Sequence, residues 1–151
     1  MLSFPHRYSK APDLPSGLIL KDKEIPSPEV LNKLLARCNL ETHPPKLLAL
    51  ALKRSDCHLS IFEECSKKLY GFVRVTSDQG LNANLWDLSA EPGKSQDLLI
   101  SILVHRVLKV IRQDLPGCSI SIAAPSIAIK ALQQNGFILD PGGIRTMGFR
   151  V

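Results

Sequence analysis

A few residues in this 151-residue sequence carry side chains capable of chemistry. Asp87 and Glu91 lie near the end of a predicted strand, where a carboxylate can act as a general base but more often serves as a surface charge. The loop of residues 91–97 precedes a long apolar helix, and a phosphate can bind at such a helix N-terminus. Cys57 and His58 are adjacent, but neighbours on a strand point to opposite faces. We therefore do not predict a nucleophile pair there.

The cysteines lack the spacing of a metal site or a disulfide framework. There is no C-x-x-C pair, and no histidine stands at zinc-ligand spacing. We therefore predict no metal site, and free thiols in a reducing compartment such as the cytoplasm or the equivalent space of an organelle. The cysteines are Cys38, Cys57, Cys65 and Cys118.

Composition and charge narrow the possible partners. The net charge is +5 and the pI is about 9.2, which favours partners with an acidic surface. The basic residues are scattered and aromatic residues make up only 5% of the chain, so nucleic-acid binding is not expected. The longest apolar run, residues 98–104, is too short to span a membrane. Residues 1–10 lack the apolar core of a secretory signal.

One long helix is the clearest structural signal. Residues 98–111 are mostly apolar. The polar residues Ser101, His105, Lys109 and Arg112 recur every three or four positions, which places them on one face of a helix. Such a helix covers a sheet, so we expect His105, on the polar stripe, to be exposed. The strands predicted on either side, 85–90 and 119–124, are then joined by a crossover and can be parallel neighbours.

The other elements complete an α/β (α+β) fold. Ser27 and Pro28 open one helix, a second follows Pro45, and a short one begins at Pro125. We predict a mixed central sheet with an antiparallel first half, a parallel crossover and about four helices. Residues 1–15 are expected to be an irregular lead-in, and residues 16–151 a single domain. Strands are predicted at residues 17–21, 57–63, 69–77, 84–90, 119–124, 137–139 and 145–151.

Several segments resemble the GNAT superfamily of N-acetyltransferases. They are residues 69–78 (LYGFVRVTSD), 84–92 (NLWDLSAEP), 134–137 (QNGF) and 140–144 (DPGGI). The likeness is closest to the branch of plant plastids and cyanobacteria, whose members acetylate protein lysines, protein N-termini or arylalkylamines. The resemblance implies the GNAT fold over residues 16–151 and adds the plastid stroma as a location.

The loop that binds acetyl-CoA in this superfamily is altered here. The family pattern is Arg/Gln-x-x-Gly-x-Gly/Ala, and an ungapped count from the preceding proline puts its Arg or Gln on Ser95. Its two glycines fall on Leu98 and Ile100, and a further frequent glycine falls on Gln96. Glycine lets backbone N–H groups approach a diphosphate, whereas branched hydrocarbon blocks that approach. We expect Ser95 to cap the helix and to leave only weak anion binding.

The resemblance also locates other functional positions. Many members have a tyrosine four residues before the Gly-Phe step that protonates the departing thiolate. Leu132 occupies that position here, and we predict it to be a core contact. Trp86 is predicted to be a core residue of the sheet. No residue is predicted as catalytic outright, and Asp87 and Glu91 are the candidates.

Two functional hypotheses follow. The first is a GNAT-fold protein that has lost efficient acetyl transfer and acts as a protein-binding or assembly module, for example of a photosynthetic complex, with no cofactor. The alternative is a divergent acyl-CoA-dependent N-acetyltransferase acting on a protein or a small amine. In that case the resemblance implies that acetyl-CoA is held by the backbone of Leu88 and Ala90 and by Lys94, Ser95 and Gln96.

Overall fold

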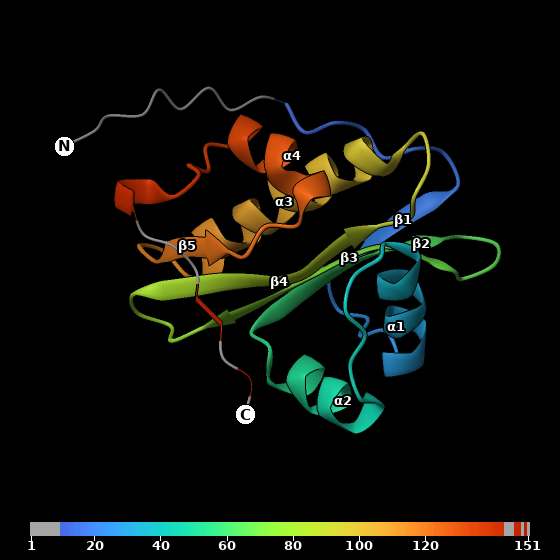
Figure 1. Cartoon of the computed structure of the whole chain (residues 1–151). Coiled ribbons are helices and arrows are strands. Elements are labelled where there is room, and N and C mark those ends of the chain that lie inside the picture. Colours follow the sequence, from blue (N-terminus) through green and yellow to red (C-terminus); the bar gives the residue numbers. More distant parts are fainter. Residues whose placement is uncertain (1–9, 144–146, 149, 151) are drawn as a thin grey trace.

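One mixed sheet lies between two helical layers (Figure 1). The computed structural model describes residues 10–143, 147, 148 and 150. The strands are β1 (Leu18–Lys21), β2 (Cys57–Glu63), β3 (Leu69–Ser77), β4 (Asn82–Ala90) and β5 (Ser119–Ile122), in that order across the sheet. The helices are α1 (Pro28–Arg37), α2 (Pro45–Arg54), α3 (Gln96–Asp114) and α4 (Ile129–Gln134), with short 3₁₀ turns at Ser126–Ala128 and Pro141–Gly143.

The direction of the strands confirms the predicted fold class. β1 to β4 pair antiparallel, and β5 pairs parallel with β4 after the crossover through α3. α3 and α4 cover one face of the sheet, and α1 and α2 lie against the other (Figure 1). Each face therefore has its own apolar cluster, because a two-sided sheet must bury both surfaces.

The start of α1 that the sequence predicts is confirmed. At the start of α1, the Ser27 hydroxyl accepts a hydrogen bond from the Val30 amide at 3.3 Å, as expected of an N-cap.

α3 buries most of its length on the sheet and comes close to β3 at Gly71. A Cβ atom at Gly71 would lie 3.1 Å from Leu103 Cδ1 and 3.2 Å from Ile61 Cδ1. The close packing of these two side chains therefore favours glycine at this position.

The strand predicted at residues 137–139 is wrong. Gly136 has φ +93° and its amide donates to the Gln133 carbonyl, while the Phe137 amide donates to the Leu132 carbonyl. This pair of bonds is the Schellman motif that ends α4, so the amide of Phe137 is used by the helix rather than by a sheet ladder. The strand predicted at 145–151 falls mostly outside the described residues; of that segment, residues 147, 148 and 150 are described and belong to no strand.

Smaller differences concern element ends. β4 begins at Asn82, two residues before the predicted start, and β5 ends at Ile122 rather than at residue 124. Residues 10–15 contain no helix or strand, while residues 1–9 of the expected lead-in lie outside the described part. Within the part of the chain that is described, no helix is long and apolar enough to cross a membrane.

Candidate functional site

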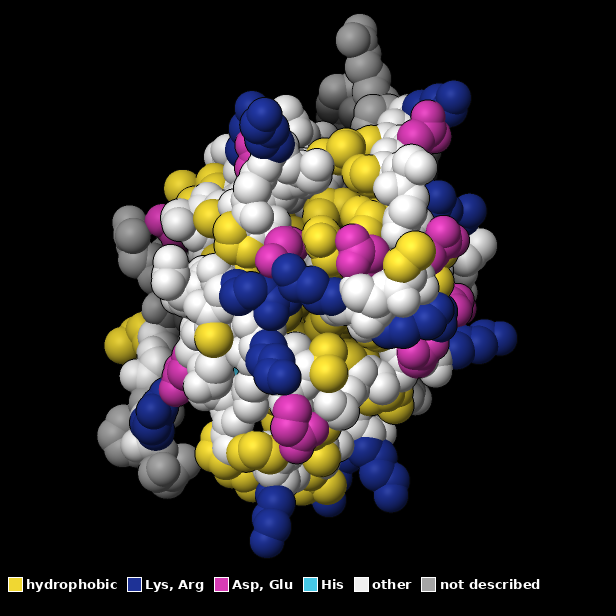
Figure 2. Space-filling model, turned by 90° about the vertical axis from the view of Figure 1, so that its right-hand side faces the viewer, with side chains coloured by type: hydrophobic (Ala, Val, Ile, Leu, Met, Phe, Trp, Pro, Cys, Tyr) yellow, Lys and Arg dark blue, Asp and Glu magenta, His cyan; other side chains and the backbone are white. Residues whose placement is uncertain are grey.

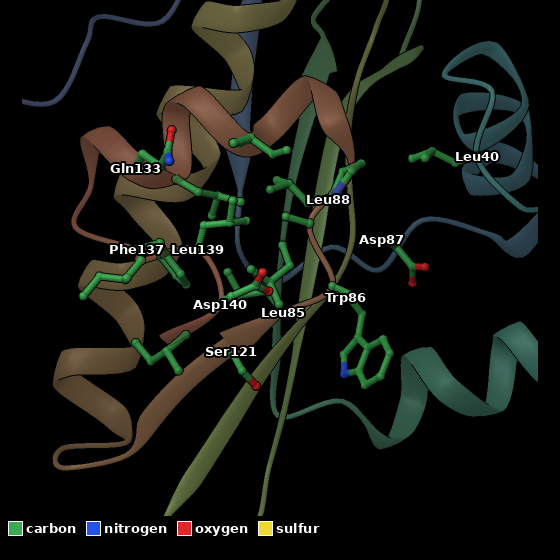
Figure 3. Close-up of a pocket in the computed structure, with 18 of the residues that line it drawn as sticks. Leu40, Leu85, Trp86, Asp87, Leu88, Ser121, Gln133, Phe137, Leu139 and Asp140 are labelled. Atoms are coloured by element: carbon green, nitrogen blue, oxygen red, sulfur yellow. The ribbon is translucent and has the colours of Figure 1, made fainter. Parts of the chain in front are cut away.

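A cleft opens where β4 and β5 part. The two strands pair only between Asn82–Leu85 and Ser119–Ile122. β4 then continues to Ala90, still paired with β3 but no longer with β5. The cleft has a volume of about 940 Å³ and lies between the ends of β4 and β5, α4 and residues 137–141 (Figure 3). This is the site expected for a ligand in an open α/β sheet, because it lies at the carboxyl end of parallel strands.

A bulge in β4 shapes the wall of the cleft. The register between β3 and β4 shifts between Phe72 and Arg74, and Asp87, opposite this shift, has φ +55°. Few residues other than glycine adopt this left-handed conformation. In an antiparallel ladder, alternate residues direct their backbone N–H and C=O groups to opposite sides of the strand. Beyond the bulge, the backbone groups of Leu88 and Ala90 therefore point away from β3, toward the side on which β5 has ended.

The outward carbonyl of Ala90 is already used by the protein itself. It accepts a hydrogen bond from the Cys38 thiol, with Sγ at 3.1 Å, and another from the Gln96 side-chain amide, with Nε2 at 3.0 Å. A carbonyl oxygen has two lone pairs, so both are occupied. Of the backbone groups that the family resemblance assigns to the coenzyme arm, this acceptor is not available without displacing a side chain.

The entrance of α3 differs from the prediction in two respects. Ser95 lies at the N-cap position, but its side chain makes no capping hydrogen bond, because its backbone is not extended (φ −96°, ψ 0°). Ile100 is fully buried in the core, whereas Leu98 is 37% exposed, so only Leu98 presents hydrocarbon at the surface. Asp97 is exposed in the first turn, where its negative charge opposes an approaching phosphate. Lys94 is exposed beside it.

Glu91, one of the two predicted general-base candidates, is a structural ion-pair residue. Its carboxylate binds Arg37 Nε at 2.6 Å and Lys68 Nζ at 2.6 Å, linking α1 to the end of β4. Burial acts to raise the pKa of Glu91, but the hydrogen bonds from Lys68 and Arg37 outweigh it, and the pKa lies below the usual range. A carboxylate held ionised in this way is a poor proton acceptor. Glu91 also does not line the cleft.

Asp87, the other candidate, does lie in the cleft. Its largely buried carboxylate pairs with Arg74 Nε at 2.5 Å and lies 3.4 Å from His43 Nε2. His43 is fixed by a reciprocal pair of hydrogen bonds: its amide donates to the Asn32 side-chain oxygen at 2.9 Å, and its carbonyl accepts from Asn32 Nδ2 at 2.8 Å. An imidazole oriented by a carboxylate at the edge of a cleft can exchange a proton with a ligand.

Sequence reasoning did not identify His43 as a functional candidate. The sequence around it, His-Pro-Pro, indicates only the end of a helix, and Asp87 is 44 positions away. The β4 bulge and the loop between α1 and α2 bring the two side chains together. The sequence indicates the loop, but neither the bulge nor the contact that the loop makes with it.

Two other predicted placements are corrected. Trp86 is 43% exposed rather than part of the core, and its indole donates to the Thr76 hydroxyl at 2.7 Å while Arg74 lies over the ring. His105 is half-buried, and its Nδ1 atom is buried without a partner.

Leu132 is a buried core residue, as predicted, and it lines the cleft where many family members have tyrosine. Among the described residues, no group of three His, Cys, Asp or Glu side chains is placed to hold a metal ion.

Solved structures of other proteins share this fold. A probable acetyltransferase of unknown function from Staphylococcus aureus superposes with a TM-score of 0.76 over 88% of this chain and 100% of that one, at 17% identity. A GNAT-family acetyltransferase from Streptococcus pneumoniae superposes with a TM-score of 0.64 over 89% of this chain and 97% of that one, at 16% identity. The chain therefore has the fold of the GNAT N-acetyltransferases, which confirms the predicted fold.

Sequence relatives place it within that superfamily. An uncharacterized N-acetyltransferase, ycf52, of Porphyra purpurea is 34% identical over 106 residues, which are 69% of this chain and 60% of that protein. The chloroplastic GCN5-related N-acetyltransferase 2 of Arabidopsis thaliana is 37% identical over 81 residues, which are 54% of this chain and 31% of that protein. No protein-family profile matches the chain. The chain spans 60% of the length of the Porphyra relative and 31% of that of the Arabidopsis relative. Together, the relatives and the solved structures show a GNAT-fold protein of the plastid and cyanobacterial branch.

Proposed function

We propose that this GNAT-fold protein has lost efficient acetyl transfer from acetyl-CoA and acts by binding another protein. The observation that carries the proposal is the occupied Ala90 carbonyl, beside a helix entrance that lacks the family's glycines at positions 96, 98 and 100. Cys38 and Gln96 already donate to the acceptor that would hold the coenzyme arm, and Leu98 covers part of the entrance. Burying a diphosphate without paired donors is strongly unfavourable. A fold persists without its cofactor because the core and the site are separate.

The cytoplasm or the plastid stroma is proposed as the location. The chloroplastic name of the Arabidopsis relative supports the stroma. The net charge of +5 supports a partner with an acidic surface, such as a component of a large assembly.

Calorimetry with acetyl-CoA tests the loss of coenzyme binding. We expect no measurable heat at millimolar coenzyme and no rise in melting temperature, since binding to the native state would stabilise it. Micromolar affinity would overturn the proposal. For the binding role, repeated pull-downs from native extract are expected to recover the same partner each time, and failure to do so would count against it.

A divergent acyl-CoA-dependent N-acetyltransferase, acting on a protein or a small amine, is the second candidate. The open cleft and the pair formed by His43 and Asp87 favour it. In this mechanism the amine attacks the thioester carbonyl and its proton passes to the imidazole. The intermediate then collapses, the carbon–sulfur bond breaks, and water protonates the thiolate. Transfer of labelled acetyl groups to a histone or arylalkylamine panel, abolished by His43→Gln, would establish it; absence of transfer at millimolar acetyl-CoA would reject it.

A further inference from the structure

α2 presents leucines to solvent on a side that the core does not need. Leu48 and Leu52 are buried in the apolar cluster that also contains residues of α1 and of the sheet, whereas Leu47 is 63% exposed and Leu50 is 41% exposed. Leu47 and Leu50 are three positions apart, so they are neighbours on the helix surface. Single exposed leucines are common, but an adjacent pair on a packed helix is typical of a contact surface.

All the charged residues of the same helix are basic. Pro45–Arg54 contains Lys46, Lys53 and Arg54 and no acidic residue. Hydrophobic side chains gather at the lower end of the molecule, where α2 lies, with Lys and Arg side chains and an acidic side chain around them (Figure 2). A small apolar patch on a helix whose charged residues are all basic suits a partner with acidic residues around an apolar centre.

Trp86 adds an aromatic side chain on the same face of the sheet. It lies opposite Arg74 in the ladder, and Phe72, two residues along from Arg74, belongs to the apolar cluster under α1 and α2. Its indole N–H is satisfied by Thr76, so the exposed part of the ring is apolar and held rigidly. Tryptophan in such a position contributes strongly to protein interfaces.

We propose that these residues form the docking surface for an acidic protein partner. The α2 surface is defined here as Lys46, Leu47, Leu50, Lys53, Arg54 and Trp86. The assignment rests on the proposed binding function and gives it a location. The leucines and Trp86 supply the apolar contact, and the cations attract and orient carboxylates at its rim.

A protein partner fits better than a lipid surface. α2 has 10 residues and offers only two exposed leucines, so insertion into a bilayer would bury little apolar area. Helices that bind at the membrane interface bury a continuous apolar face together with their basic residues. Here the opposite side of α2, with Leu48 and Leu52, is already buried in the apolar cluster shared with α1 and the sheet.

The experiment begins with photo-crosslinking in native extract. Benzoylphenylalanine replaces Leu50 in one version of the full chain and Lys109, exposed on α3, in the control version. We expect an acidic protein to be captured from position 50 and not from position 109. The captured protein is then purified and titrated against the wild-type chain and variants.

Two variants of the α2 surface are compared with a charge-matched control. Leu47→Gln with Leu50→Gln removes the apolar contact, and Lys46→Glu with Lys53→Glu reverses two charges. The latter places one acid near each end of the helix, so its effects on the helix dipole offset one another. Arg106→Glu with Lys109→Glu makes the same change in charge on α3.

We expect each α2 variant to weaken binding about tenfold or more, and the α3 control to leave it unchanged. Added salt should weaken wild-type binding. Capture from position 109 alone, or equal affinity of all variants, would reject the α2 surface while leaving the binding function intact. No partner from either position would reject the binding function as well. Leucine-dependent binding to vesicles containing phosphatidylglycerol would show that the surface meets lipid instead.

Discussion

Replacing Ser95 with Arg, Gln96 with Gly and Leu98 with Gly should raise the affinity for acetyl-CoA, if the wild-type chain has lost coenzyme binding as we propose. The changes release one donor from the Ala90 carbonyl and remove the exposed hydrocarbon at the α3 entrance. Ile100 is left in place because its side chain is fully buried in the core. The backbone amides at the start of α3 can then approach a diphosphate.

The magnitude follows from the number of hydrogen bonds gained. Each amide bond to a charged phosphate contributes about 1.5–3 kcal/mol, so two such bonds correspond to a gain in affinity of roughly 10²- to 10⁴-fold. Two glycines in the first turn cost about 2 kcal/mol of stability in total, or roughly 4–8 °C in melting temperature. A domain with a usual stability of about 5–15 kcal/mol remains folded after this loss.

Calorimetry with acetyl-CoA on the wild type and the triple variant measures the difference. A control carrying Arg at position 95 and Ala at positions 96 and 98 also removes the long side chains but keeps the Cβ atoms. We expect its affinity to lie between the other two, because glycine is needed for the closest approach. A folded triple variant that shows no binding at millimolar coenzyme would refute the steric reasoning.

Three further outcomes are expected. Glu91→Gln should destabilise the protein by about 1–3 kcal/mol at pH 7. Because the folded-state pKa of Glu91 is lowered, its contribution is present above its unfolded value near 4.5 and is lost at lower pH, so urea unfolding should show the difference from wild type shrinking below about pH 4. Burial and nearby carboxylates raise the pKa of Cys57 to about 11, so mass spectrometry after alkylation at pH 8 should find exposed Cys65 modified well before it; equal rates would contradict this. Gly71→Ala should lower stability by about 1–3 kcal/mol in thermal unfolding because its Cβ would crowd Leu103, and an unchanged melting temperature would show that the helix can shift freely.

Local signals in the sequence were sufficient for most of the framework. Ser27 with Pro28 opens α1, and the periodic apolar residues of α3 identify a helix that crosses a sheet. These predictions succeeded because capping and periodicity depend on residues within one or two turns. The same local reasoning failed at residues 137–139, where a β-prone segment is used to end α4.

The candidate site depended on contacts between distant segments. Neither the pairing of His43 with Asp87 nor the exposure of Trp86 could be read from neighbours in the chain. The pairing follows from the bulge in β4 and the loop between α1 and α2, and the exposure depends on which distant segments pack around Trp86. The half-burial of His105 likewise depends on how closely the chain packs around α3.

The sequence by itself, through its resemblance to the GNAT superfamily, indicated the fold and the replacement of the family's glycines at positions 96, 98 and 100. Both follow from residue types at fixed positions along the chain. Only the tertiary structure decided that Ile100 is buried while Leu98 is exposed, and that Gln96 and Cys38 occupy the Ala90 carbonyl. The physical reason is that every residue has a backbone carbonyl, so the residue type does not indicate which groups donate hydrogen bonds to it. What it binds is settled by the groups that packing brings within hydrogen-bond distance.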